Sequence, residues 1–558
     1  MRRPMSVRNY DAALRLLAER GHHVHLAFES VHKRLADQWG PAERLSDESP
    51  NVTYGLAPPE GRDAWARFAM GLRLGLDHLF YRQPQYRETP SIPDYLEARV
   101  PPVVVRLAAS RLLSGPRGRR LLQAVLRALE AALPRRAGVD AFMREHAPDV
   151  VAMTPLAQPG TPQAELIRSA AALGVPSAGC IASWDNLTTG GWIREVPDVV
   201  TVWNEIQRGE AVELHGLPAE RVVATGAQAW DHWFDWSPST ERAEFCAKVG
   251  LRPDRPFLLF LGSSGYVNVE READFVAEWV RRAREDPDGR LSHVGVLVRP
   301  HPLTFETHWP ELLALGLDEV TVWPAAGAEP AGPGPRADYY DSMFHSAGVF
   351  GVNTSAFIES AIVGRTAHTV LLPEFAHAQQ DMLHFRYLRH ENGGPLRIAG
   401  SWDEHLAQLA DTLADPARDQ EHARRFVSSF VRPDGLDVPA TPKLVAVLEG
   451  LAEVTPRPAP EMPAWARSLR VALTPAVLGA HAWGSRHATV ERGRALRKRA
   501  RRRWRHERRR ALATAGRLRT RSAPSPPSKP TDPPLERPVN GGPPTPADRT
   551  PDPVGGRS

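Results

Sequence analysis

The chain has 558 residues, 42% of them hydrophobic, so it is too long for one core and can build two globular domains with extensions. Its formal net charge of +5 comes from residues 486–521, which carry 16 Lys and Arg against two Glu. The rest of the chain has a net charge of −9, which argues against nucleic-acid binding by the globular domains. Cys180 and Cys246 lie far apart without metal-ligand spacing, and no run reaches the ~18 apolar residues of a membrane span, so we expect a cytoplasmic protein.

The first half alternates helices with short strands. Residues 9–20 have helical apolar spacing, residues 22–28 read as a strand, and residues 61–147 are mostly helical. Further strand-like runs, separated by helix-length segments, lie at 149–154, 176–182, 198–203 and 221–226. This alternation predicts a parallel sheet covered by helices on both faces.

One element of this pattern is missing at the beginning. Such a domain normally opens with a strand, but residues 1–8 contain no apolar run and the chain enters directly on the helix at 9–20. We therefore expect a domain without its first strand, either because the chain begins downstream of it or because the domain has lost it.

The second half repeats the scheme after a boundary at residues 237–240. Strands are predicted at 256–262, 294–299, 319–324, 347–352 and 367–372, and helices at 268–285, near 337–346, from 355 and near 379–390. We predict an α/β protein with domains at 1–236 and 237–450, followed by a helical, increasingly basic extension at 451–521. Residues 522–558 contain 12 Pro and are expected to be disordered.

Two strands of the second half end in polar groups suited to an anion. Arg299 and His301 stand between prolines after a strand, and Gly262, Ser263 and Ser264 follow another one. Open α/β sheets bind ligands at the carboxyl ends of their strands, so these residues predict contacts to a nucleotide diphosphate. The alternative for each is an ordinary surface turn.

A third strand end strengthens this interpretation. Asn353, Thr354 and Ser355 open a helix, whose free N–H groups attract an oxyanion, and Glu359 lies one turn further along. We predict that Glu359 accepts hydrogen bonds from ribose hydroxyls. The alternative is a common helix cap followed by an exposed glutamate.

Two further segments offer candidates for catalysis. Asp185 follows a strand of the first half and is the first candidate for a general base, although an Asx-type turn would also explain it. Gln380 and His384 are four residues apart, so on a helix they share a face. We predict that they lie near the donor sugar, with His384 in catalysis, against the alternative of ordinary surface or core residues.

The basic segment at 486–521 has a thin apolar stripe that includes Trp504. An interfacial helix on anionic lipid is one interpretation, with a peripheral position on the inner face of a membrane. A solvated basic arm and contact with nucleic acid without sequence specificity are the alternatives.

These segments together resemble bacterial glycosyltransferases of the GT-B fold. The resemblance covers residues 149 to about 441 and rests on the SWDNLT, VWN, TGAQ and NTSAFIE segments. Residues 202–231 resemble the UDP-GlcNAc 2-epimerase-like branch, and the RPHP and NTS segments are similar to motifs of transferases that use CMP or CDP donors.

The resemblance implies two Rossmann-like domains that face a cleft, with the donor nucleotide on the second and the acceptor on the first. It implies metal-independent transfer of a sugar from a nucleotide-sugar co-substrate, of the UDP type or else the CDP or CMP type, with no resident cofactor and no metal site. The acceptor would be a surface polysaccharide, a glycoconjugate or a lipid-linked carbohydrate. The alternatives are a 2-epimerase or hydrolase-like enzyme and an inactive scaffold that only binds nucleotide.

Overall fold

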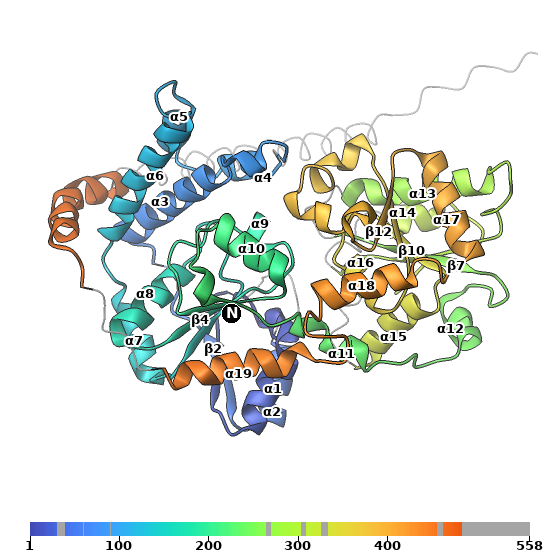
Figure 1. The fold of residues 1–558 in the computed structure, drawn as a ribbon, viewed down its shortest axis with the longest axis horizontal. Helices are drawn as coiled ribbons and strands as arrows, with labels where there is room; N and C mark the ends of the chain where they lie inside the picture. Colours follow the sequence, from blue (N-terminus) through green and yellow to red (C-terminus); the bar gives the residue numbers. More distant parts are fainter. Residues whose placement is uncertain are drawn as a thin grey trace, which may run out of the picture. The chain divides into compact units, whose positions relative to one another are not determined.

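The computed structural model describes residues 1–30, 39–59, 61–89, 91–263, 269–302, 309–324, 333–454 and 461–482. Residues 1–482 form one unit and residues 483–558 another. The basic segment predicted at 486–521 and the Pro-rich tail at 522–558 lie outside the described residues. Within the first unit, strands gather in a first and a second half, in the order of the chain (Figure 1).

The strands of the first half pair in parallel, but in two separate sheets. The smaller sheet holds β1 and β2, and the larger one has the order β3-β4-β5-β6. These strands are β1 (Val24–Phe28), β2 (Val52–Leu56), β3 (Val151–Met153), β4 (Ser177–Cys180), β5 (Val199–Val202) and β6 (Val222–Ala224). The sequence analysis missed β2, because Val52–Leu56 is largely exposed and lacks an apolar run.

The beginning of the chain lies between these two sheets. Residues Pro4–Asn9 form a 3-10 helix, and the Tyr10 side chain shares a 2.8 Å hydrogen bond with Thr154 Oγ1 after β3 and donates to the Cys180 carbonyl of β4 (3.2 Å). One hydrophobic cluster joins Tyr10 with Phe28 of β1 and Ala178 of β4. Residues 1–8 form no regular strand, as expected, although the Glu29 and Ser30 N–H groups just after β1 donate to the Met1 and Arg2 carbonyls (3.0 and 3.2 Å).

The second half contains one six-stranded parallel sheet with the order β12-β11-β10-β7-β8-β9. Its strands are β7 (Phe257–Leu261), β8 (Gly295–Arg299), β9 (Val320–Val322), β10 (Gly348–Gly351), β11 (Ala367–Val370) and β12 (Leu396–Ala399). Alternate residues enter different cores: Leu259 belongs to one cluster, and Leu258 and Phe260 belong to the other. Helices therefore cover both faces, as continuous apolar strands predict, and the α/β prediction with two parallel-sheet halves is confirmed.

Helices connect the strands throughout. In the first half they are α1 (Asp11–Glu19), α2 (Gly40–Glu48), α3 (Ala64–Phe80), α4 (Ser91–Glu97), α5 (Pro102–Ala109), α6 (Pro116–Ala131), α7 (Ala137–His146), α8 (Gln163–Leu173), α9 (Asn186–Thr189), α10 (Glu205–Glu213) and α11 (Asp231–Phe234). In the second half they are α12 (Arg242–Val249), α13 (Glu272–Arg284), α14 (Trp309–Ala314), α15 (Pro333–Phe344), α16 (Ala356–Ile362), α17 (Trp402–Ala414), α18 (Gln420–Phe430) and α19 (Ala440–Ala452). Residues 464–482 form a further helix.

Two segments depart from a simple division into halves. Helix α19 returns to the first half, where Leu444 and Val445 join the cluster of Tyr10 and Phe28, beside α1 in Figure 1. The helix predicted near 379–390 is wrong: this segment holds 3-10 turns at Leu383–Tyr387 and His390–Asn392. The turns place both Leu383 and Phe385 in cores, which a single helix face would not do.

Candidate functional site

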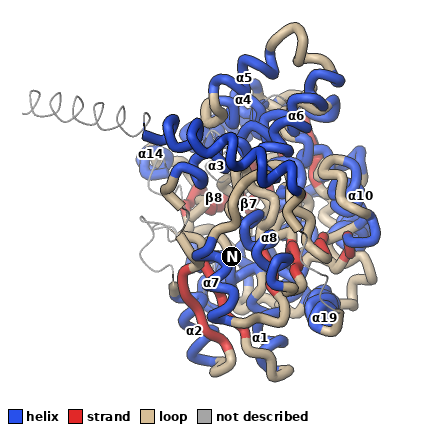
Figure 2. The backbone as a smooth tube through the Cα atoms, turned by 90° about the vertical axis from the view of Figure 1, so that its left-hand side faces the viewer, coloured by secondary structure: helices blue, strands red, loops and turns tan. Residues whose placement is uncertain are grey.

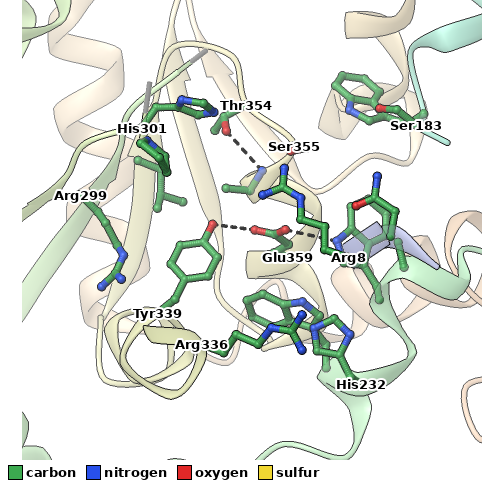
Figure 3. A pocket seen from close by; sticks show the side chains of 18 of the residues that line it. Arg8, Ser183, His232, Arg299, His301, Arg336, Tyr339, Thr354, Ser355 and Glu359 are labelled. Carbon is green, nitrogen blue, oxygen red and sulfur yellow. Dashed lines mark hydrogen bonds between the residues drawn. The ribbon is translucent and has the colours of Figure 1, made fainter. Parts of the chain in front are cut away.

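A pocket of about 290 Å³ lies where the carboxyl ends of strands from both halves meet. From the first half it is lined by residues that follow β4, β5 and β6, and from the second half by residues that follow β7, β8 and β10 (Figure 3). The lining residues are Arg8, Asn9, 182–184, Trp203, Ala229, Trp230, His232, Trp233, Trp236, 261–262, 299–302, Arg336, Tyr339, 354–356 and Glu359. The edges of two parallel sheets thus face one space, which is where open α/β sheets bind ligands.

Positive charge dominates the lining of this pocket. Arg8 enters from the 3-10 helix at the beginning of the chain and Arg336 from α15, and each is close enough to the other for their charges to interact. Burial, with the positive charge of Arg8, lowers the pKa of His301 to about 4, and burial with Arg336 lowers the pKa of His232 to about 4. Both imidazoles are therefore neutral at pH 7, and the surrounding arginines leave the pocket suited to an anion.

Glu359 is the carboxylate in the described lining of the pocket. Its Oε2 accepts a 2.6 Å hydrogen bond from the Tyr339 hydroxyl, and its Oε1 accepts one of 3.2 Å from Trp230 Nε1, so it ties α16 to α15 and to the segment after β6. Burial raises the pKa of Glu359, while these two donors and Arg8 act in the opposite direction. A carboxylate has about four lone-pair sites, so two remain for a ligand.

Arg299 lies in the pocket wall, but its guanidinium is already engaged. Nη1 donates to Asp338 Oδ2 (3.0 Å) and to Ser342 Oγ (2.7 Å), and the group lies 5.0 Å from the centre of the Tyr339 ring. The side chain is 5% exposed, and burial lowers its pKa. Arg299 thus holds Tyr339 and α15 in place, and it shares the pocket's positive charge with Arg8 and Arg336, which the sequence analysis did not single out.

The turn after β10 contributes to the lining of the pocket. Thr354 and Ser355 line it, and Thr354 Oγ1 accepts a 3.3 Å hydrogen bond from the Ala356 N–H. Asn353 lies outside the lining and donates its amide to the Ala378 carbonyl. Helix α16 has only seven residues, so its dipole adds less than the two arginines do.

The turn after β7 is built for close approach. A Cβ on Gly262 would lie 2.8 Å from the His301 amide nitrogen, so only glycine allows the ends of β7 and β8 to meet at the pocket. Ser263 points elsewhere: it is buried outside the lining, and its N–H donates to Glu272 Oε1 (3.0 Å). Burial raises the pKa of Glu272 to about 7. Ser264 lies outside the described residues.

Asp185 and His384 come together from opposite halves, but neither lines the pocket. Thr188 connects them, because its hydroxyl donates to the Asp185 carbonyl (2.9 Å) and shares a 3.2 Å hydrogen bond with His384 Nδ1. Burial lowers the pKa of His384, and the nearby Asp185 partly offsets this. The His384 ring packs edge-on against Trp184, which does line the pocket (4.6 Å between ring centres).

Gln380 is exposed and does not line the pocket, because the helix that would have aligned it with His384 does not form. Its neighbour Gln379 is the buried residue. The Gln379 amide donates to Thr369 Oγ1 (3.0 Å) and to the Val352 and Val370 carbonyls (3.2 Å each), so it fixes the loop after β11.

An aromatic wall is a further part of the site that the sequence analysis overlooked. Tryptophans from three separate segments line the pocket, and Trp203 packs against Trp230 with ring centres 4.9 Å apart. A visible signal was the spacing W-D-H-W-F-D-W at 230–236, which is dense in aromatics for a segment between domains. The tryptophans of the wall are Trp184, Trp203, Trp230, Trp233 and Trp236.

Two searches of the described residues give plain results. Within them, no group of three or more His, Cys, Asp or Glu side chains could hold a metal ion. Among the helices that the structure describes, none is long and apolar enough to cross a membrane.

No family model matches the sequence, and a search of curated proteins finds no match. Among solved structures, the chain is similar to WaaG, a glycosyltransferase involved in lipopolysaccharide biosynthesis (12% identity, TM-score 0.40, 80% of this chain and 96% of that one). It is also similar to S. aureus MnaA in its co-structure with UDP (12%, 0.39, 82% and 97%) and to UDP-GlcNAc 2-epimerase from Neisseria meningitidis bound to UDP-GlcNAc (11%, 0.39, 80% and 98%). These are the groups of proteins that the sequence motifs resemble.

Proposed function

We propose that the protein is a glycosyltransferase that moves a sugar from a nucleotide-activated donor to a hydroxyl group of a surface polysaccharide or glycoconjugate. The observation that carries this proposal is the pocket at the carboxyl ends of strands from both halves, with Arg8 and Arg336 beside Glu359 in its described lining. A nucleoside diphosphate is the anion that such a pocket suits, since it needs positive charge for its phosphates and an acceptor for its ribose.

In the reaction, the bond between the anomeric carbon and the diphosphate breaks, and a bond from that carbon to the acceptor oxygen forms. The acceptor hydroxyl gives its proton to solvent water, and negative charge develops on the leaving diphosphate. We assign the stabilisation of that charge to Arg8 and Arg336, which approach the pocket from different halves. Because Arg8 belongs to the first half and Arg336 to the second, both halves contribute charge to the donor site.

The positions of Asp185 and His384 support a different role from the proton transfer expected of them. Both lie outside the pocket lining, and their shared partner Thr188 and the packing of His384 on Trp184 hold one wall of the pocket. We therefore assign them as positioning residues for Trp184. The proposal gives Gln380 no contact, since it is exposed outside the pocket.

Transfer is favoured over 2-epimerisation by the chemistry of the lining. Epimerisation at the sugar C2 needs groups that remove and return a proton there. In the described lining, the carboxylate of Glu359 is assigned to the ribose, and burial keeps His232 and His301 neutral with pKa values of about 4, so they are weak bases. The donor is proposed to be of the UDP type, with CDP or CMP donors as the other choices.

Thermal unfolding with UDP, GDP, CDP, CMP and dTDP tests the donor site, because a ligand of the native state raises the melting temperature. We expect a diphosphate to give the largest rise, and the Arg8→Met and Arg336→Met variants to bind it about ten- to a hundredfold more weakly, as for lost bonds to a charged group. Arg424→Met, at an exposed site on α18, is the matched control. No shift with any of the five nucleotides would refute the proposal.

A second assay separates the reactions. Incubation of the enzyme with a radiolabelled nucleotide sugar and a polysaccharide acceptor should transfer label to the acceptor. Release of an epimerised sugar without acceptor labelling would instead support the 2-epimerase alternative. Binding without either product would identify the inactive scaffold.

A further inference from the structure

Helices α5 and α6 expose more large apolar side chains than a solvent-facing hairpin needs. Leu112, in the connection between them, is 90% exposed, and Val103 on α5 and Leu121 on α6 are each 61% exposed. Val125 (48%) and Leu107 (41%) complete the set. Several exposed large apolar side chains on two helices that contact each other indicate an interaction surface.

These residues are additional to the core stripe of the two helices. Val104 and Ala108 of α5 and Leu122 and Leu126 of α6 already belong to the cluster that includes α3, as the grouping of α3 to α6 in Figure 2 illustrates. The exposed residues Val103 and Leu107, and likewise Leu121 and Val125, are spaced by four and form second apolar stripes. One apolar stripe suffices to fold a surface helix, so the second is free to meet a partner.

The same segment is the most basic part of the described chain. Residues 98–129 contain seven Arg and neither Asp nor Glu, within a body whose net charge is −9 outside 486–521. Arg106, Arg111, Arg117 and Arg120 are exposed beside the apolar stripes. An apolar stripe flanked by arginines is complementary to an anionic bilayer, with headgroups for the charges and acyl chains for the leucines.

We propose that α5, residues 110–115 and α6 form a docking surface for anionic phospholipid membranes, with Leu112 and Leu121 entering the interface. Charge complementarity decides between the occupants: a symmetric contact with a second copy would place the exposed arginines of two such surfaces face to face. Anionic lipid removes that repulsion. The surface lies within the described residues and is independent of the predicted basic segment at 486–521.

The helix at 464–482 extends this surface. Arg470 anchors it to the end of α6, with Nε and Nη2 donating to the Ala132 and Leu133 carbonyls at 2.7 and 2.9 Å. The helix leaves Trp465, Val471 and Leu478 exposed, and tryptophan favours the boundary between headgroups and acyl chains.

Fluorescence of the full chain tests where the membrane contact lies. A Leu112→Cys variant labelled with an environment-sensitive dye takes the label selectively, because Cys180 and Cys246 are buried. With vesicles of phosphatidylcholine containing a quarter phosphatidylglycerol, the emission should shift to the blue; pure phosphatidylcholine should give no shift. The control is Leu315→Cys, an exposed apolar position in the second half (59%), which should stay unshifted.

Two other results would overturn the proposal. Cosedimentation with anionic vesicles while the label at 112 stays in water would assign binding to the tail alone. A shift that follows protein concentration without lipid would identify a second copy as the occupant.

Affinity measurements complete the test. Arg111→Ser/Arg117→Ser/Arg120→Ser should lower the affinity for these vesicles about fivefold per arginine, from about 1 kcal/mol each. Leu112→Ser/Leu121→Ser/Val125→Ser should lower it at least tenfold, with Leu56→Ser/Leu315→Ser as the control at exposed apolar sites elsewhere. Unchanged affinity of the leucine variant would refute insertion.

Discussion

Replacing Glu359 with Gln tests whether this residue contacts ribose or only supports the pocket wall. The carboxylate accepts from Tyr339 and Trp230 and has about two lone-pair sites left for ribose hydroxyls. In a glutamine, the carbonyl oxygen can keep the hydrogen bond from Trp230 Nε1, and the NH₂ group in place of Oε2 can donate to the Tyr339 hydroxyl oxygen, so the side chain loses its charge and one of its two acceptor oxygens. Glu359→Gln thus keeps the contacts to Tyr339 and Trp230 that support the pocket wall and removes the charged acceptor for the ribose hydroxyls.

The expected loss follows from hydrogen bonds to a charged group, which contribute about 1.5–3 kcal/mol. We expect Glu359→Gln to weaken UDP binding about ten- to a hundredfold, measured by titration calorimetry. With 2′,3′-dideoxy-UDP, which lacks both hydroxyls, the wild type and the variant should bind alike, because the interaction is absent in either case.

The control is Glu404→Gln on α17, whose carboxylate accepts from the Gly400 N–H outside the pocket. Equal losses of affinity for UDP and for the dideoxy ligand would refute the ribose contact. The role of Glu359 would then be only to hold Tyr339 and Trp230 in the pocket wall. Thermal unfolding without nucleotide checks that the variant is folded.

Three further predictions concern the framework around the site. Gly226→Ala should lower the free energy of unfolding by about 1–3 kcal/mol in denaturant titration, since Gly226 has φ +87° and an added Cβ would lie 2.6 Å from the Cβ of Ala440. The control is Gly209→Ala on α10, where an added Cβ meets nothing within 4 Å. Equal effects of the two substitutions would contradict this prediction. Asp231→Ala should lower the free energy of unfolding by about 3–5 kcal/mol, because it leaves the buried Arg432 without its ion pair and the Ala440 and Thr441 N–H groups at the start of α19 without their acceptor. The double variant Asp231→Ala/Arg432→Met should recover part of this loss. Burial raises the pKa of Glu210 to about 7, so the folded state favours its protonated form: this stability is full below pH ~4.5 and is lost as pH rises through 7. Glu210→Gln keeps an acceptor for the Tyr387 hydroxyl. Its free energy of unfolding should match that of the wild type at pH 4.5 and exceed it by up to about 3 kcal/mol at pH 8. An equal gain in stability at pH 4.5 and pH 8 would refute the raised pKa of Glu210.

The strands were predictable because burial on both faces leaves a local trace. Residues 256–262 and 294–299 are nearly continuous apolar runs, since each side chain of β7 and β8 enters one of two cores. The exposed strand β2 carries no such pattern, and neither does β12, where two of the four residues are half-buried. The helix expected at 379–390 failed because its apolar residues pack in two directions, a tertiary demand that spacing by four did not reveal.

The sequence by itself determined the class of the fold and the strand ends at which polar residues gather, because apolar periodicity and Gly, Pro and Asn-Thr-Ser turns act over a few residues. It therefore located Gly262, His301, Thr354 and Glu359, which the structure brings into one pocket. Only the tertiary structure decided which charges face that pocket, because ion pairing depends on contacts between segments distant in sequence. Such contacts engage Arg299 with Asp338, set Asp185 and His384 behind the wall of Trp184, and bring Arg8 from the beginning of the chain to a site in its second half.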